Sequence, residues 1–138
     1  MEFHAKIVKE EDAFIVSFPD FPNINTYGDS FAEAQENAHE ALNAALESDF
    51  ERGYEIPKPT VANGKRLHFP IQVLPHIQLA YELKKIRRGS SQSDIARKLG
   101  ISYQAYQKLE NPRKCNPTVK TLERIGEVYG KELRITFR

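Results

Sequence analysis

The chain has 138 residues, of which 40% are hydrophobic and 28% charged; these values are ordinary for globular proteins and exclude fibrous and wholly disordered classes. The net charge of +1 hides a division, because residues 1–74 carry 13 acidic and 6 basic side chains whereas residues 75–138 carry 6 acidic and 14 basic. A basic region attracts polyanions, and an acidic region is repelled by them. We therefore expect two domains, residues 1–74 and 75–138, with partners of opposite charge.

The sequence gives no support to several other classes. No apolar run approaches the ~20 residues that span a bilayer, and the first residues lack the order of a signal peptide, so we expect a cytoplasmic protein without membrane contact. Cys115 is the single cysteine, which excludes an internal disulfide and a cysteine zinc site. The histidines are scattered without ligand spacing. We expect neither a metal nor a cofactor.

The first 28 residues predict three strands. Apolar residues alternate over residues 3–7 and 14–18, on either side of a charged turn, which is typical of a β-hairpin. The two prolines of residues 19–22 then interrupt the alternation, because proline removes a ladder donor and fixes φ. A third strand is expected over residues 24–27.

A helix and a fourth strand are predicted next. Ser30 opens a capping box, apolar residues from 31 to 46 recur at helical spacing, and Gly53 is a suitable stop. Prolines and an Asn-Gly pair predict an irregular connection over residues 55–66. Alternation over residues 67–73 predicts a strand that returns to the sheet, so the order is β-β-β-α-β.

This order, together with the segments PDFPNINTYGDSFAEAQENAHEAL and EIPKP, resembles the amino-terminal domain of HicB antitoxins over residues 3–73. The resemblance implies a partial RNase H-like fold that binds and masks a small basic RNA-cleaving toxin of the HicA type. Within the turn at residues 19–22, Asp20 and Phe21 are the candidate toxin contacts. A purely structural corner is the alternative, since prolines often serve only as turn residues.

The RNase H relationship raises an enzymatic alternative, because clustered carboxylates in that chemistry hold two metal ions. The candidates are Asp12, Asp20, Asp29 and Glu40. Acidic residues in turns and on helix faces mostly serve solvation, and no spacing marks these four as convergent. We therefore expect a protein that is not an enzyme.

The basic half predicts a helix from Pro75 to Arg88 followed by a helix-turn-helix. One apolar stripe comes from residues 95–99 and a second from residues 101–109, with Gly100 at the corner between them. The register Gln-x-x-x-Ala-x-x-x-Gly from Gln92 onward, and a closing helix after the Asn-Pro-Thr of residues 116–118, resemble the phage-repressor (Cro/C1, XRE) class over residues 79–130. The basic half is therefore predicted to bind double-stranded operator DNA.

The resemblance to that class implies roles for individual residues. Gln92 would contact a backbone phosphate, and Arg113 and Lys114 are further phosphate candidates. Lys85 and Glu110 would form a structural ion pair. The base-edge candidates lie on the exposed face of the recognition helix and are Ser102, Tyr103, Gln104 and Lys108.

The last residues, 132–137, alternate once more and predict a terminal strand. Leu133, Ile135 and Phe137 would share one of its sides. The basic half offers no partner strand, so we expect pairing with a second copy and a homo-dimer or higher even oligomer. Packing within the same chain is the alternative.

The predicted class is α+β: a β-β-β-α-β domain followed by an all-α helix-turn-helix domain with a terminal strand. The predicted function is that of an antitoxin which masks a HicA-like toxin and represses its own operon. A helix-turn-helix transcription factor with a small-molecule-sensing amino-terminal domain is the competing hypothesis.

Overall fold

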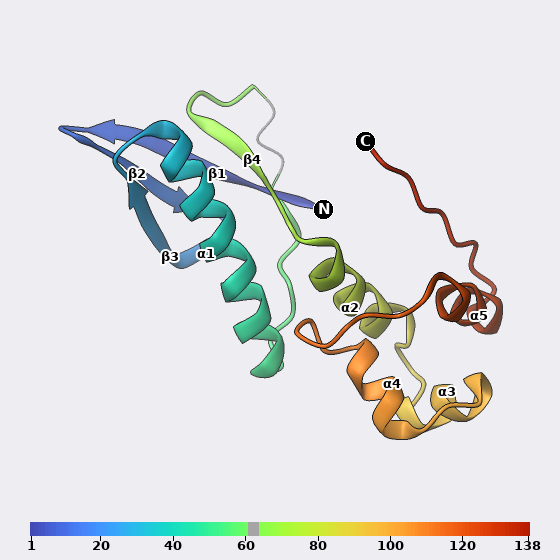
Figure 1. Ribbon diagram of the computed structural model, residues 1–138. Coiled ribbons are helices and arrows are strands. Elements are labelled where there is room, and N and C mark those ends of the chain that lie inside the picture. The colour runs from blue at the N-terminus through green and yellow to red at the C-terminus, as the bar shows by residue number, and fades with distance from the viewer. Residues whose placement is uncertain (61–63) are drawn as a thin grey trace. The chain divides into compact units, whose positions relative to one another are not determined.

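The computed structural model describes residues 1–60 and 64–138, which form two compact units, unit 1 (residues 1–78) and unit 2 (residues 79–138). Figure 1 shows that unit 1 contains the sheet and that unit 2 is helical. The predicted irregular connection at residues 55–66 includes residues 61–63, which lie outside the described residues.

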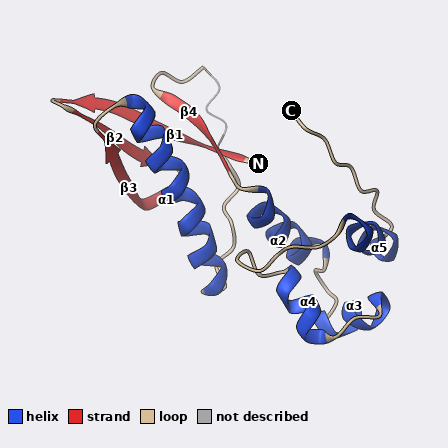
Figure 2. Cartoon of the chain, in the orientation of Figure 1, coloured by secondary structure: helices blue, strands red, loops and turns tan. Residues whose placement is uncertain are grey.

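Unit 1 is built on a four-stranded antiparallel sheet in the order β3-β2-β1-β4 (Figure 2). The strands are β1 (Glu2–Glu10), β2 (Ala13–Phe18), β3 (Phe21–Gly28) and β4 (His68–Gln72). β1 and β2 form the predicted hairpin, and β4 returns to β1 with Ile71 opposite Phe3. The predicted β-β-β-α-β order is confirmed.

The third strand begins earlier than predicted. Phe21 already pairs with Phe18, so the corner between β2 and β3 consists of Pro19 and Asp20 alone. The ring of Phe21 packs edge-on against that of Phe3, with 4.8 Å between the centroids. Pro22 is tolerated inside β3 because β3 lies at the edge of the sheet, where a missing N–H need not break the ladder.

The helix α1 (Phe31–Glu51) packs against the sheet (Figure 1). Its N-cap is Ser30, whose Oγ accepts a hydrogen bond from the backbone N–H of Glu33 at 3.1 Å, as predicted. Small residues let the helix approach β3 closely: a Cβ atom on Gly28 would lie 2.3 Å from the backbone nitrogen of Ala34. A side chain at position 28 would therefore push the helix off the sheet.

A buried amide joins α1 to the segment that follows β4. Asn43 is only 4% exposed, and its Nδ2 donates to the carbonyl oxygens of His39 and Gln72 at 2.9 and 3.1 Å. Its Oδ1 accepts a hydrogen bond from the backbone nitrogen of Leu74 at 2.8 Å. A buried amide without partners costs about 1–3 kcal/mol. The bond to His39 lies within α1, and the two bonds to Gln72 and Leu74 hold the helix and the end of β4 in register.

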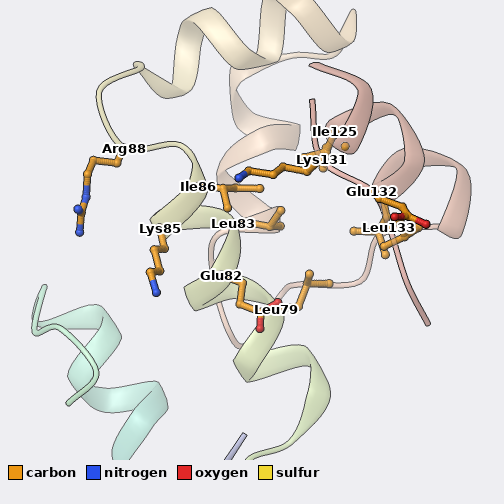
Figure 3. A pocket seen from close by; sticks show the side chains of 12 residues that line it. Leu79, Glu82, Leu83, Lys85, Ile86, Arg88, Ile125, Lys131, Glu132 and Leu133 are labelled. Carbon is orange, nitrogen blue, oxygen red and sulfur yellow. The ribbon is translucent and has the colours of Figure 1, made fainter. Parts of the chain in front are cut away.

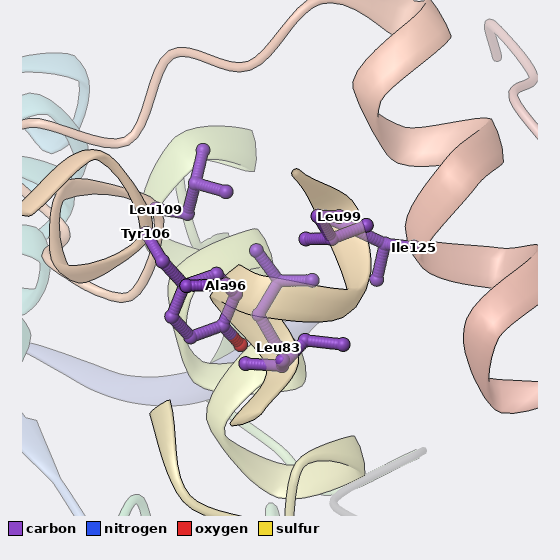
Figure 4. Close-up of a cluster of buried hydrophobic side chains, with 7 residues drawn as sticks. Leu83, Ala96, Leu99, Tyr106, Leu109 and Ile125 are labelled. Atoms are coloured by element: carbon purple, nitrogen blue, oxygen red, sulfur yellow. The ribbon is translucent and has the colours of Figure 1, made fainter. Parts of the chain in front are cut away.

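Unit 2 consists of short helices around one apolar cluster. The helices are α2 (Pro75–Ile86), which starts in unit 1, α3 (Gln92–Leu99), α4 (Tyr103–Leu109) and α5 (Val119–Tyr129). The buried side chains that meet in Figure 4 are Leu83, Ile95, Ala96, Leu99, Tyr106, Leu109 and Ile125. The predicted helix-turn-helix and its closing helix are confirmed. None of the described helices is long and apolar enough to cross a membrane.

The tail, residues 131–138, differs from its prediction. It contains no strand in the single chain, so the predicted terminal strand at residues 132–137 is wrong for the isolated molecule. The reason is that a strand needs a neighbouring backbone, and the described part of unit 2 contains no other strand. The tail leaves α5 through Gly130, whose φ is 63°, and the N–H of Lys131 donates to the carbonyl of Gly126 at 2.8 Å.

Candidate DNA-binding surface and partner-binding face

A tight corner sets the angle between α3 and α4. Gly100 adopts φ 70° and ψ 31°, a left-handed conformation that glycine reaches at little cost, and its N–H points back to the carbonyls of Ala96 and Arg97. The N–H of Ile101 also donates to the carbonyl of Ala96, at 3.0 Å. From α5, Arg124 donates to the carbonyl of Leu99. The carbonyls of Ala96, Arg97 and Leu99 at the end of α3 thus have donors, and these bonds fix the corner that leads into α4.

The outer face of α4 carries the predicted base-edge residues. Tyr103, Gln104 and Lys108 are exposed, whereas Tyr106 and Leu109 are buried in the apolar cluster. Donors of this kind match base edges: glutamine pairs with adenine and lysine donates to guanine acceptors. The exposed face of α4 therefore presents two polar side chains that can bond to base edges and one aromatic side chain. The buried residues of the same helix anchor it in the apolar cluster.

Two side chains on α4 differ from the sequence analysis. Ser102 is the N-cap of α4, and its Oγ accepts a hydrogen bond from the N–H of Ala105 at 3.0 Å, so the hydroxyl already has a structural task. Gln107 was not among the predicted site residues. It is exposed, and its Nε2 donates to the Oη of Tyr103 at 3.0 Å. The i, i+4 spacing of Tyr103 and Gln107 was the available signal.

A buried ion pair lies behind this face, and it involves Arg87 rather than the predicted Lys85. Arg87 donates from Nε and Nη2 to the two carboxylate oxygens of Glu110, at 2.6 and 3.0 Å. Glu110 is 2% exposed, whereas Lys85 is exposed. The hydrogen bond that Arg87 donates to Glu110 raises the pKa of the guanidinium above its already high value, so Arg87 is a permanent cation.

The same carboxylate also positions Gln92, the predicted phosphate contact. Gln92 is the first residue of α3, and its Nε2 donates to a carboxylate oxygen of Glu110 at 3.2 Å. Its partner Glu110 ends α4 as the C-cap residue. Gln92 therefore lies at a helix N-terminus, where backbone N–H groups favour anions, with its side chain oriented by the recognition helix.

The segment after α4 adds exposed cations. Arg113 and Lys114, the other predicted phosphate contacts, are both exposed, and the N–H of Lys114 donates to the carbonyl of Asn111 at 3.0 Å. Their neighbour Cys115 is buried, and burial raises the pKa of its thiol to about 11. At neutral pH this thiol is protonated and unreactive, which fits an incidental cysteine.

In unit 1, the two predicted toxin contacts lie in different environments. Phe21, which would have to be exposed to contact a partner, is only 7% exposed and belongs to the core. Asp20 accepts a hydrogen bond from the backbone nitrogen of Thr60 at 3.0 Å and another from the Thr60 hydroxyl. Asp20 thus ties the long connection after α1 to the sheet. Phe21 packs in the core, and a toxin contact at this corner stays a prediction.

A different surface of unit 1 combines exposed apolar and acidic groups. Val8, Ile15 and Tyr27 lie side by side on β1, β2 and β3, since Val8 is opposite Ile15 and Ile15 is opposite Tyr27. We call these three residues the apolar row. Ile15 is 38% and Tyr27 59% exposed, whereas the adjacent Ile7 and Val16 are buried. The exposed acidic turn at residues 10–12 closes the β1–β2 hairpin next to the row.

The candidate nuclease carboxylates are not brought together as a metal site. Asp12 lies in the hairpin turn, Asp20 is bonded to Thr60, and Glu40 is on the exposed side of α1. Throughout residues 1–60 and 64–138, no group of three or more histidine, cysteine or acidic side chains has the geometry to hold a metal ion.

The fold and this surface define a helix-turn-helix DNA-binding protein that carries an additional α/β unit. The family comparisons identify that unit. Residues 2–78 match the family model for the HicB-like antitoxin of bacterial toxin–antitoxin systems, and residues 81–135 match a helix-turn-helix model. The chain belongs to the HicB-like antitoxin family.

Two relatives agree with this assignment. Antitoxin HicB 2 of Photorhabdus laumondii subsp. laumondii is 28% identical, over 92% of this chain and 92% of the relative. Antitoxin HicB of Escherichia coli K12 is 30% identical, over 91% of this chain and 90% of the relative. The solved N-terminal domain of Burkholderia pseudomallei antitoxin HicB has a TM-score of 0.49 at 21% identity, over 54% of this chain and 99% of that one. Both sequence matches extend across the two units.

Proposed function

We propose that this chain binds and masks a small basic RNA-cleaving toxin of the HicA type and represses the operon that encodes both proteins. The observation that carries the proposal is the joining of two surfaces in one chain. Unit 1 belongs to the antitoxin family and has 13 acidic and 6 basic residues, and unit 2 presents the polar face of α4 on a helix-turn-helix. Neither task requires catalysis or a cofactor from this chain, and both take place in the cytoplasm.

Masking is proposed to use the apolar row together with the acidic turn at residues 10–12. Carboxylates steer a basic partner and speed the encounter, but their attraction is weakened by salt, so a lasting complex also needs buried apolar contact. The exposed Ile15 and Tyr27 supply such a contact beside the acidic turn. A toxin surface made for RNA phosphates would be covered sterically and neutralised by charge at the same time.

The test is an RNA-cleavage assay with the product of the adjacent gene and increasing amounts of the antitoxin. Replacing both Ile15 and Tyr27 by alanine should raise the amount needed for inhibition at least about tenfold, because aromatic anchors dominate such interfaces. Tyr54→Ala is the matched control, since Tyr54 is 56% exposed but lies after α1, away from the row. Equal inhibition by the variant of the apolar row and by the control would exclude the apolar row as the toxin contact. Full cleavage at saturating wild-type protein would exclude the antitoxin function itself.

Repression is proposed to rest on a two-fold dimer bound to operator DNA. Base edges would be read by Ser102, Tyr103, Gln104 and Lys108, and phosphates would be held by Gln92, Arg113 and Lys114. A single short recognition helix reads few base pairs, so helix-turn-helix proteins place two of them on adjacent half-sites. We propose that the tail residues Leu133, Ile135 and Phe137 hold the dimer together.

A further inference from the structure

The tail exposes apolar side chains that its own chain does not cover. Phe137 is 99% and Ile135 is 55% exposed, although both are large and apolar. The polar residues Arg134 and Thr136 alternate with them, as in a strand with one apolar side. Two large apolar side chains of the tail are therefore mostly in contact with solvent, a state that association would relieve.

A groove of about 590 Å³ lies in the same unit, between α2 and α5. Its apolar lining comes from Leu79, Leu83 and Ile86 on α2 and from Leu122 and Ile125 on α5. Figure 3 shows Lys85 and Arg88 on one side of the groove and Leu133 of the tail on the other. The first part of the tail thus lines the groove without filling it.

The path of the tail is fixed at its start. Lys131 is hydrogen-bonded to the carbonyl of Gly126, and a Cβ on Gly126 would lie 2.7 Å from the carbonyl oxygen of Lys131. The backbone therefore lies directly on α5 at this point. Leu133 then lies against the groove, while Ile135 and Phe137 extend beyond it into solvent.

We infer that the groove between α2 and α5 receives the tail of a second copy of this chain, with Phe137 as the anchor. This inference rests on the dimer of the proposed function and names its acceptor surface. Each chain has one apolar tail and one incompletely filled apolar groove. In a two-fold dimer each tail would lie in the groove of the other chain, so both tails would be covered and both grooves filled. The groove carries Glu82 as well as Lys85 and Arg88, and the tail carries Glu132, Arg134 and Arg138, so both surfaces have both signs of charge.

The test measures dimerisation of the full chain by sedimentation, without toxin or DNA. Phe137→Ala removes the anchor, and Leu122→Glu places a charge in the groove. Each variant alone should dimerise at least about tenfold more weakly than the wild type. Thr136→Ala is the matched control, because this exposed, uncharged residue alternates with the apolar ones, and it should leave dimerisation unchanged.

Mixing the two variants tests whether the tail of one chain binds in the groove of the other chain. A mixed dimer contains one intact pair, the Phe137 tail of the Leu122→Glu chain in the groove of the Phe137→Ala chain. The mixture should therefore dimerise more strongly than either variant alone. A mixture no better than its components would overturn the inference, as would a Phe137→Ala protein that dimerises like the wild type.

A disulfide test covers the possibility that Leu122→Glu unfolds. One chain carries Phe137→Cys and the other Leu79→Cys, and the native Cys115 does not interfere because it is buried. Mixed covalent dimers are expected after mild oxidation. Covalent dimers formed only between two Phe137→Cys chains would show that the tails meet each other, which overturns the groove as acceptor. Toxin inhibition does not enter these measurements, so a failure here is distinct from a failure of the antitoxin function.

Discussion

The ion pair between Arg87 and Glu110 lies directly behind the recognition helix, because Glu110 is the residue that ends α4. Arg87→Met keeps most of the side-chain volume but leaves a carboxylate buried without its cation. Removing one partner of a buried pair costs about 3 to 5 kcal/mol, and we expect the free energy of unfolding of unit 2 to fall by that amount. Urea denaturation followed by circular dichroism measures it.

Arg88→Met is the control for that substitution, since Arg88 is the exposed neighbour. Its effect should stay within about 0.5 kcal/mol, as is usual for surface changes. If both variants unfolded at the same urea concentration as the wild type, the pair would contribute nothing to stability.

The residues on the outer face of α4 should differ from Gln92 in the kind of DNA binding that they support. Gln104→Ala and Lys108→Ala should each lose about 1 to 3 kcal/mol of discrimination between operator and random DNA. Gln92→Ala should weaken binding to operator DNA and to random DNA by a similar factor, because a phosphate contact does not depend on the base sequence. Fluorescence anisotropy with the two DNAs at one salt concentration gives the comparison.

Lys120→Ala is the charge-matched control for Lys108→Ala, because Lys120 is exposed on α5. It should reduce the affinity for both DNAs by the same small factor. Equal losses on operator and random DNA for Gln104→Ala and Lys108→Ala would contradict the assignment of a reading face.

Individual residues show which features could be predicted from the sequence alone. The exposed residues of α4 were predicted from helical spacing, because buried positions on an amphipathic helix recur every three or four residues. The choice of Lys85 for the ion pair was wrong by two residues, which on an α-helix turns a side chain by about 200°. Phe21 was misplaced because a proline on each side suggested a loop, and only the pairing with Phe18 shows that it faces the core.

At the scale of elements, the starts of helices were the most predictable features. Ser30, Ser91, Ser102 and Thr118 are all N-caps whose side chains accept from the N–H three residues ahead. Such a bond depends on local sequence alone, so a local pattern can reveal it. Of these four residues only Ser30 was predicted as a cap, whereas Ser102 was predicted to contact a base edge.

Strand limits were less predictable, because a strand is defined by a partner that is distant in sequence. β3 begins at Phe21 since β2 extends to meet it there. The tail has the alternation of a strand but no neighbour within the described chain, so it remains without secondary structure. Its alternation is a property of the sequence, and alternation alone does not make a strand without a neighbouring backbone.

At the scale of the whole molecule, the division of charge predicts that the two activities can be separated. A fragment of residues 1–78 retains 13 acidic and 6 basic residues and all four strands, so we expect it to inhibit toxin cleavage of RNA. It lacks α3 and α4 and should not bind operator DNA. Circular dichroism first establishes that the fragment folds. A folded fragment that left the toxin fully active would place the toxin contacts in unit 2.

The position of β1 in the middle of its sheet has a consequence for synthesis. β1 pairs with β2 a few residues later, but its other neighbour is β4, and Glu2 lies opposite Gln72. During translation one edge of β1 stays without hydrogen-bond partners until residue 72 has left the ribosome, and contacts so distant in sequence form slowly. An open strand edge is prone to pairing with other chains. Slow translation between α1 and β4 would therefore prolong the period in which the newly made antitoxin is open to aggregation.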